Sequence, residues 1–161
     1  MSPSRAPPPD PAVSARPSGR VEESILALRK LAASHPEDAD IQRQLGDALF
    51  VAGRVSEASA AFVEAVRRNR SCAGAHAGLA RIFDERGDAA AARAAYQQVV
   101  RYSPDNAAAQ SRLGQLLTMF RVDEAEGPLR RALALNAGDI EAARHLGVAL
   151  TRAPGAVHLD F

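Results

Sequence analysis

The sequence contains no tryptophan, a single cysteine and few aromatic residues, with five phenylalanines and two tyrosines among 161 residues. The lone cysteine, Cys72, cannot form a disulfide within the chain, which is consistent with a reducing compartment. The net charge is only +1 at pH 7, so no general attraction to nucleic acid or to an anionic membrane surface is expected. No apolar run has the length of a signal peptide or a membrane span. We therefore expect a cytoplasmic protein that binds no nucleic acid and inserts into no membrane.

Motifs that indicate catalysis or cofactor binding are also missing. The sequence has no P-loop, nucleophile elbow, HExxH, CxxC or dinucleotide-binding glycine motif. Its histidines lack the spacing to one another and to Cys72 that is typical of metal ligands: His35, His76, His145 and His158. We therefore expect no catalytic residue, no cofactor and no metal, and a protein that is not an enzyme.

What the sequence does contain is a helical unit of 34 residues, 73–106. Leu79 and Phe83 fall on one face of a first helix. Gly87 is expected to end that helix, because a residue without Cβ readily takes the left-handed conformation. Asp88 then follows as an N-cap for a second helix. The inner face of this second helix is expected to carry Ala92, Tyr96 and Val99. So small a helix pair cannot bury its own apolar stripe and needs neighbours.

The same pattern recurs along the chain at this period. One period upstream, equivalent positions hold Leu45, Gly46, Leu49, Gly53, Ala58, Phe62 and Ala65. One period downstream, after deletion of one residue near Arg121, they hold Leu113, Gly114, Leu117, Ala125, Leu129 and Ala132. Half units follow at the two ends, carried by Leu28, Leu31 and Pro36 upstream and by Leu146, Gly147 and Leu150 downstream. A constant period of this size is typical of a stacked repeat array.

These positions resemble the tetratricopeptide repeat family, whose pattern is an L-G pair, a large residue three further on, A-x3-F and a late proline. The resemblance covers roughly 21–152, although the usual tryptophan near the start of each repeat is replaced by Gln42, His76 and Gln110. It implies an all-α fold: an α-solenoid of stacked antiparallel helix pairs in a right-handed superhelix. About three full repeats are expected, with a half repeat at each end.

Glycines on the first helices predict where helices approach closely. Gly46 is one such position, and a large side chain there is expected to force two helices apart. Gly74 and Gly78 form a GxxxG pattern in a charged helix, which indicates close helix contact and not membrane dimerisation.

The N-terminal stretch 1–20 is rich in proline and is expected to be a disordered tail. The same prolines disfavour a mitochondrial presequence, and we favour a solubilising leader over an SH3 or WW ligand at Pro7–Pro9. The next segment, Val21–Ser34, is expected to form one helix that caps the first repeat. Its inward residues are predicted to be Ile25, Leu28 and Leu31.

The third repeat and the C-terminal end are irregular. Gly127-Pro128 falls inside the expected second helix, so that helix either kinks in its first turn or begins at Pro128; we favour the kink because the apolar residues keep phase. At the C-terminal end, 153–161 is expected to be a tail after a lone first helix, 140–152. The apolar face left by this helix could be covered by the tail, by another chain or by further sequence, and it predicts self-association.

In this family, the resemblance implies that peptides or partner helices bind a concave groove lined by the first helices. By phase, the residues that face this groove are Arg43, Gln44, Asp47, Phe50, Arg81, Asp84, Glu85, Ser111, Arg112, Gln115, Met119, Arg144 and Arg152. The arginines among them could hold a partner carboxylate with two hydrogen bonds. Charge reversal of Arg81 and Arg112 is expected to leave the fold intact and to abolish partner capture.

One family subtype, the chaperone-binding clamp, is not expected. Its pattern matches at Arg43 and Arg112, but Asp47 and Arg81 stand where asparagines are required and Ala108 where a lysine is required. A bound carboxylate would be repelled by Asp47.

Three functions remain. We favour a non-catalytic adaptor or scaffold that binds a protein or peptide and helps to assemble a complex. The alternatives are a recruiting segment of a fused or separately encoded transferase or hydroxylase, and a self-assembling scaffold. The abundance of alanine and arginine over lysine suggests a bacterial source.

Overall fold

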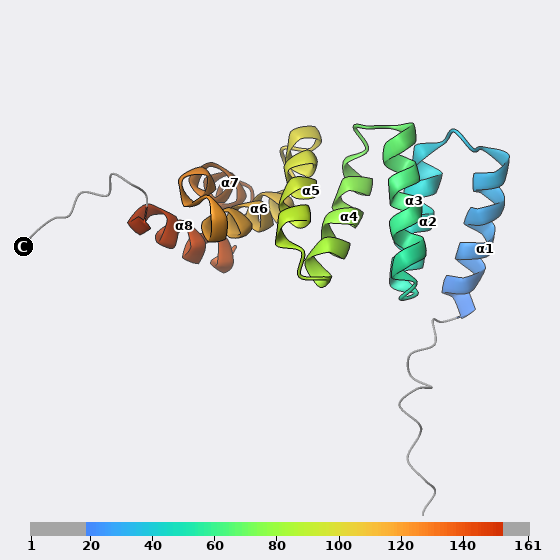
Figure 1. Cartoon of the computed structure of the whole chain (residues 1–161), viewed down its shortest axis with the longest axis horizontal. Helices are drawn as coiled ribbons and strands as arrows, with labels where there is room; N and C mark the ends of the chain where they lie inside the picture. Colours follow the sequence, from blue (N-terminus) through green and yellow to red (C-terminus); the bar gives the residue numbers. More distant parts are fainter. Residues whose placement is uncertain (1–18, 153–161) are drawn as a thin grey trace, which may run out of the picture.

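The computed structural model describes residues 19–152, and the predicted tails fall outside this range except for Gly19 and Arg20, which already belong to the first helix. Within it lie eight helices and no strand (Figure 1). Their bounds are α1 Gly19–Ser34, α2 Ala39–Val51, α3 Val55–Arg68, α4 Ala73–Glu85, α5 Ala89–Tyr102, α6 Ala107–Phe120, α7 Val122–Leu135 and α8 Ile140–Arg152. The all-α prediction is confirmed.

The helices form three complete pairs, α2–α3, α4–α5 and α6–α7, with α1 packed before the first and α8 after the last (Figure 1). Contacts join each pair to the next along the long axis of the molecule. We call α2, α4, α6 and α8 the first helices. The second helices are α3, α5, α7 and, by its repeat position, α1. The predicted α-solenoid, with half a repeat at each end, is confirmed.

Glycine and aspartate define the turns within the first two pairs. Gly53 and Gly87 have φ angles of 74° and 73°, the left-handed region that favours glycine. The carboxylate of Asp88 accepts a hydrogen bond of 3.0 Å from the backbone N–H of Ala91 and caps α5. The third pair is joined by Arg121 alone, with a φ of −143°. The single deletion in the sequence is therefore taken up by a shorter turn.

Helix α7 runs through Pro128 instead of beginning at it, so the alternative start at Pro128 is wrong. Proline has no backbone N–H and cannot bond to the carbonyl of Glu124. The helix nevertheless keeps its phase, because Ala125, Leu129 and Ala132 on either side of Pro128 are all fully buried. Burial of this continuous stripe favours a helix over the whole segment.

The aromatic ring of Phe62 lies between two first helices and is fully buried. A Cβ added at Gly46 of α2 would lie 2.6 Å from the ring, and one at Gly78 of α4 would lie 2.4 Å from it. In the third pair, Gly114 approaches the side chain of Leu129 in the same way, at 2.4 Å. The predicted close approach at Gly46 is confirmed, and so is the close contact expected from the GxxxG pattern.

Two predictions of inward residues need correction. In α1, Ile25 is buried, but Leu31 remains 46% exposed because no described helix covers that side of α1. In α4, Leu79 and Phe83 are only partly buried, and Ile82 is the fully buried large side chain. It belongs to the same buried cluster as Leu45 and Leu49 of α2, a contact between repeats that the pattern of a single repeat does not reveal.

Candidate functional site

The first helices form one side of the solenoid, which we call the first-helix face. Neighbouring first helices contact one another in the pairs α2–α4 and α6–α8. All of the predicted groove residues lie on these helices: Arg43, Gln44, Asp47 and Phe50 on α2; Arg81 and Asp84 on α4 with Glu85 at its end; Ser111, Arg112, Gln115 and Met119 on α6; and Arg144 and Arg152 on α8. Their surroundings differ widely.

On α2, the polar side chains are bound to one another. Arg43 donates through Nε to Asp40 at 2.8 Å and through Nη1 to Asp47 at 2.6 Å, while Gln44 donates to Asp40 at 2.6 Å. The Arg43 stem also covers Gly74 of α4, where a Cβ would lie 2.5 Å from Cδ. Burial raises the pKa of Asp47 in spite of the nearby Arg43 charge. Arg43 is therefore engaged within the chain and fixes α2 against α4.

Asp84 joins three helices through its carboxylate, which is only 18% exposed. Arg112 of α6 donates to it twice, from Nε at 2.7 Å and from Nη2 at 2.9 Å, and the Tyr96 hydroxyl of α5 donates at 3.1 Å. Burial and the Asp84 charge raise the pKa of Tyr96 to about 12, so its hydroxyl remains a donor at neutral pH. Reversing the charge of Arg112 would place two carboxylates together. The expectation that this change leaves the fold intact is therefore replaced by a structural role for Arg112.

Ser111 and Gln115 of α6 form hydrogen bonds within the protein and are largely buried. Ser111 is 6% exposed, and its hydroxyl accepts a hydrogen bond of 3.1 Å from Gln115. The side-chain oxygen of Gln115 accepts from Arg112 at 2.9 Å. The Gln115 amide thus links Ser111 to the Arg112–Asp84 pair, and Ser111 offers no free surface to a partner.

Between α6 and α8, His145 connects two polar side chains. Burial, followed by the charge of Arg144, lowers the pKa of His145, so the imidazole is neutral at neutral pH. Its Nε2 then accepts from Arg144 at 2.9 Å, and its Nδ1 donates to the Thr118 hydroxyl at 2.8 Å. Arg144 also pairs with Glu141 at 2.5 Å. Periodicity alone did not reveal His145 or Thr118, because their contact joins two different repeats.

Arg81 differs from Arg43, Arg112 and Arg144, because no carboxylate of the described chain lies within ion-pair distance of it. Its guanidinium carbon lies 4.2 Å from the centroid of the Phe50 ring, a cation–π contact between α4 and α2. The guanidinium is exposed. Its hydrogen-bond donors are therefore available to a ligand.

A pocket of about 220 Å³ opens beside Arg81, between α4 and the beginning of α6. It has an alanine-rich wall with a few polar groups, formed by Ala77, Arg81, Tyr96, Asn106, Ala108 and Ala109. Most of these residues were not among the predicted groove positions. A cluster of alanines on facing helices was the available signal, since small side chains leave space where helices diverge.

Glu85, Met119 and Arg152 are exposed, and Met119 retains 69% of its surface. They lie at the C-terminal ends of α4, α6 and α8.

We expect removal of either member of the Asp84–Arg112 pair to destabilise the protein, with a coupling energy of about 1 kcal/mol between the two alanine substitutions. A double-mutant cycle in urea measures it. The exposed Arg130–Glu126 pair of α7 is the matched control, and its coupling should be about 0.3–0.5 kcal/mol. Equal coupling in the two cycles would show that Asp84 does not hold α4 to α6.

Comparison with known protein families identifies the type of repeat. Two family models, both described as tetratricopeptide repeat, match residues 20–100 and 78–140. No curated protein matches the chain. No helix in the range 19–152 combines the length and apolarity that crossing a membrane requires.

Solved structures share the fold at low sequence identity. YrrB, a TPR protein described as having an unusual peptide-binding site, aligns with a TM-score of 0.71 and 24% identity over 77% of this chain and 64% of its own. MamA from Desulfovibrio magneticus RS-1 aligns with a TM-score of 0.69 and 21% identity over 83% of this chain and 76% of its own. A tetratricopeptide repeat protein from Parabacteroides merdae ATCC 43184 aligns with a TM-score of 0.68 and 17% identity over 81% of this chain and 53% of its own. This chain thus spans slightly less than two thirds of YrrB.

Proposed function

The chain belongs to the tetratricopeptide repeat family, and we propose that it is a non-catalytic cytoplasmic adaptor that binds a peptide segment of a partner protein and helps to assemble a complex. The segment would lie along the first-helix face, over the pocket beside Arg81. The peptide-binding site named for YrrB is consistent with this function on the same fold.

The observation that carries the proposal is the free guanidinium of Arg81 beside the alanine-rich pocket. Arg43 and Arg112 are neutralised by carboxylates of the same chain, whereas Arg81 rests on Phe50 without such a partner. The ring contact orients the planar guanidinium while leaving its edge available for two parallel hydrogen bonds. The first-helix face therefore combines an available cation with a small apolar recess beside it.

This combination favours a segment in which an acidic side chain lies close to a single apolar side chain. The carboxylate would accept hydrogen bonds from Arg81, and the apolar side chain would enter the pocket lined by Ala77 and Ala109. Asp47 and Glu85 flank the arginine on α2 and α4. They disfavour a segment with several adjacent acids, which provides selectivity through repulsion.

Peptide display on the purified chain tests this proposal. Selected peptides should contain an acidic residue within a few positions of an aliphatic or aromatic residue. Arg81→Glu should weaken their binding at least about tenfold, equivalent to about 1.4 kcal/mol, and Arg81→Lys should weaken it less. Calorimetric titration of a selected peptide and of its amide analogue, with Asp or Glu replaced by Asn or Gln, measures these changes.

Arg101→Glu is the matched control, because Arg101 also lies over an aromatic ring, that of Tyr102, but on the second helix α5. It should leave the peptide affinity unchanged. Equal binding by wild type and Arg81→Glu, or equal loss in both reversal variants, would contradict the proposal.

A further inference from the structure

The two ends of the described solenoid expose apolar side chains at positions that are buried or partly buried in the complete repeats. On α1, Leu31 is 46% exposed, whereas the equivalent residues of the other second helices are fully buried: Ala65, Val99 and Ala132. On α8, Leu150 is 43% exposed, whereas the equivalent Leu49 of α2 and Leu117 of α6 are 2% and 3% exposed and the equivalent Phe83 of α4 is partly buried. In the range 19–152, α1 is thus a second helix without its first, and α8 a first helix without its second.

The two unpaired helices have complementary shapes. In two of the three complete pairs, a glycine of the first helix receives a large side chain of the second, with Gly46 against Phe62 and Gly114 against Leu129; the third pair has the small residue Ala80 at this position. The equivalent glycine of α8 is Gly147, and a Cβ added there would meet nothing within 4 Å. The equivalent large residue of α1 is Leu28. Helix α8 thus has an unfilled space over Gly147, which we call the notch. Helix α1 carries Leu28, the equivalent of the side chains that fill this space in complete pairs.

We propose that the partner for both ends is a second copy of this chain: α8 of one copy packs against α1 of the next and completes a helix pair across the junction. Leu28 of one copy then lies over Gly147 of the other, and Leu31 and Leu150 become buried. The contact joins two different surfaces, so each dimer retains one free end of each kind. Such a heterologous contact extends into a linear assembly.

Helix α2 provides the rest of the surface on which α8 of the preceding copy would pack. Successive first helices contact one another in α2–α4 and α6–α8, so α8 of the preceding copy would also lie against α2. A groove of about 310 Å³ lies there between α1 and α2, lined by Arg20, Val21, Ser24, Asp47, Ala48 and Val51. Ala48 is partly exposed in this groove, whereas the equivalent Ile82 and Leu116 are 0% and 3% exposed beneath a preceding first helix. The groove therefore matches the position of a missing first helix.

The charges at the junction are also complementary. Within the chain, Arg43 of α2 covers Gly74 at the beginning of α4. The position of Arg43 is occupied in α8 by Arg144, and the position of Gly74 is occupied in α2 by Asp40. The same geometry across the junction brings Arg144 of one copy to Asp40 of the next. Asp40 already pairs with Arg43, and Arg144 with Glu141, so the proposed orientation joins these two pairs into a row of alternating charge.

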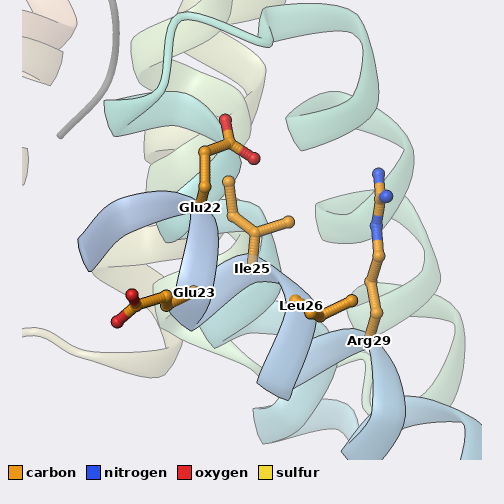
Figure 2. Close-up of a pocket in the computed structure, with 5 residues that line it drawn as sticks. All are labelled: Glu22, Glu23, Ile25, Leu26 and Arg29. Atoms are coloured by element: carbon orange, nitrogen blue, oxygen red, sulfur yellow. The ribbon is translucent and has the colours of Figure 1, made fainter. Parts of the chain in front are cut away.

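The side of α1 that carries Glu22 and Arg29 differs from the proposed interface (Figure 2). Its surface recess is lined by residues of α1 alone: Glu22, Glu23, Ile25, Leu26 and Arg29. Figure 2 shows Arg29 and Glu22 directed toward the neighbouring helices, where they pair with Glu57 at 2.6 Å and Arg54 at 3.5 Å. Leu26 on this side is 57% exposed, as outward positions of a second helix usually are. It therefore serves as a control position outside the interface.

Sedimentation velocity of the full chain over a micromolar concentration range tests the proposal. Wild type should show species that grow beyond the dimer as the concentration rises. Gly147→Leu, which fills the notch, and Leu31→Glu, which charges the opposite end, should each be monomeric. Leu26→Glu should assemble as wild type does, since Leu26 lies outside the interface. Thermal unfolding of diluted samples confirms that the variants are folded.

A mixture of Gly147→Leu and Leu31→Glu gives the sharpest result. Each variant retains the one end that the other has lost, so the mixture should form 1:1 dimers and nothing larger. A strictly monomeric wild type would overturn the proposal, and so would either variant alone still forming dimers, because that result indicates a contact between like surfaces. Peptide binding at Arg81 does not depend on either outcome.

Discussion

Replacing Phe62 with alanine should lower the free energy of unfolding by about 3–5 kcal/mol, the range observed when a buried aromatic ring is removed. The ring has no exposed surface and fills the space between Gly46 of α2 and Gly78 of α4. Neither glycine has a side chain that could move into the cavity. The loss therefore includes both the apolar burial of the ring and a cavity that spans two repeats.

Urea unfolding followed by circular dichroism measures this loss. Phe120→Ala is the matched control, because Phe120 lies at the end of α6 with 54% of its surface exposed; it should change the stability by less than about 0.5 kcal/mol. Similar losses in the two variants would show that Phe62 does not have the central packing role that its burial indicates.

Placing leucine at Gly46 should destabilise the protein by at least about 1–3 kcal/mol through overpacking. A Cβ at this position would already lie 2.6 Å from the Phe62 ring, and the ring cannot retreat because Gly78 lies close against it on the other side. We expect α2 and α3 to move apart. Loss of contact at this point should also weaken the packing of α4.

Gly147→Leu is the control for the same substitution at the equivalent position of α8, where a Cβ meets nothing within 4 Å. In dilute solution it should be neutral or stabilising by up to about 1 kcal/mol, because leucine favours the helical conformation more than glycine does. A Gly46→Leu protein as stable as Gly147→Leu would contradict the close packing of α2 on α3.

The repeating parts of the fold were predictable because they depend on local chemistry and on a constant period. Gly53 and Gly87 each take the left-handed conformation after a first helix, and Asp88 caps the helix that follows. Gly46 marked the close approach to Phe62 through its position in the repeat. Each of these features is set by residues within one helix pair.

The contacts between repeats were not predictable in the same way. Asp84 and Arg112 are 28 residues apart, and His145 and Thr118 are 27 residues apart. Neither separation follows from the period of the repeat or from the turn of a helix. Phase alone placed Arg112 on the binding surface, whereas its two hydrogen bonds to Asp84 give it a structural role.

The arginines of the first-helix face therefore fall into two groups: those paired with carboxylates of the same chain, and those whose charge is available to a ligand. The ion pair of Arg112 with Asp84 connects α6 to α4, whereas the ion pairs of Arg43 lie within α2 and only its aliphatic stem reaches α4; in both cases carboxylates of the same chain neutralise the arginine. Arg81 is stabilised by a ring instead of a carboxylate. No carboxylate of the described residues lies within ion-pair distance of it, and this is why we propose Arg81 as a main contact for the partner.

The most direct measurement is the mapping of a display-selected peptide onto isotope-labelled Gly147→Leu protein by amide chemical shifts, with the variant used to keep the chain monomeric. The shifts should concentrate around the pocket, at Ala77, Arg81 and Ala108, and should be reduced in Arg81→Glu. Shifts concentrated instead on the outward positions of the second helices, such as Val63 and Arg130, would contradict binding on the first-helix face.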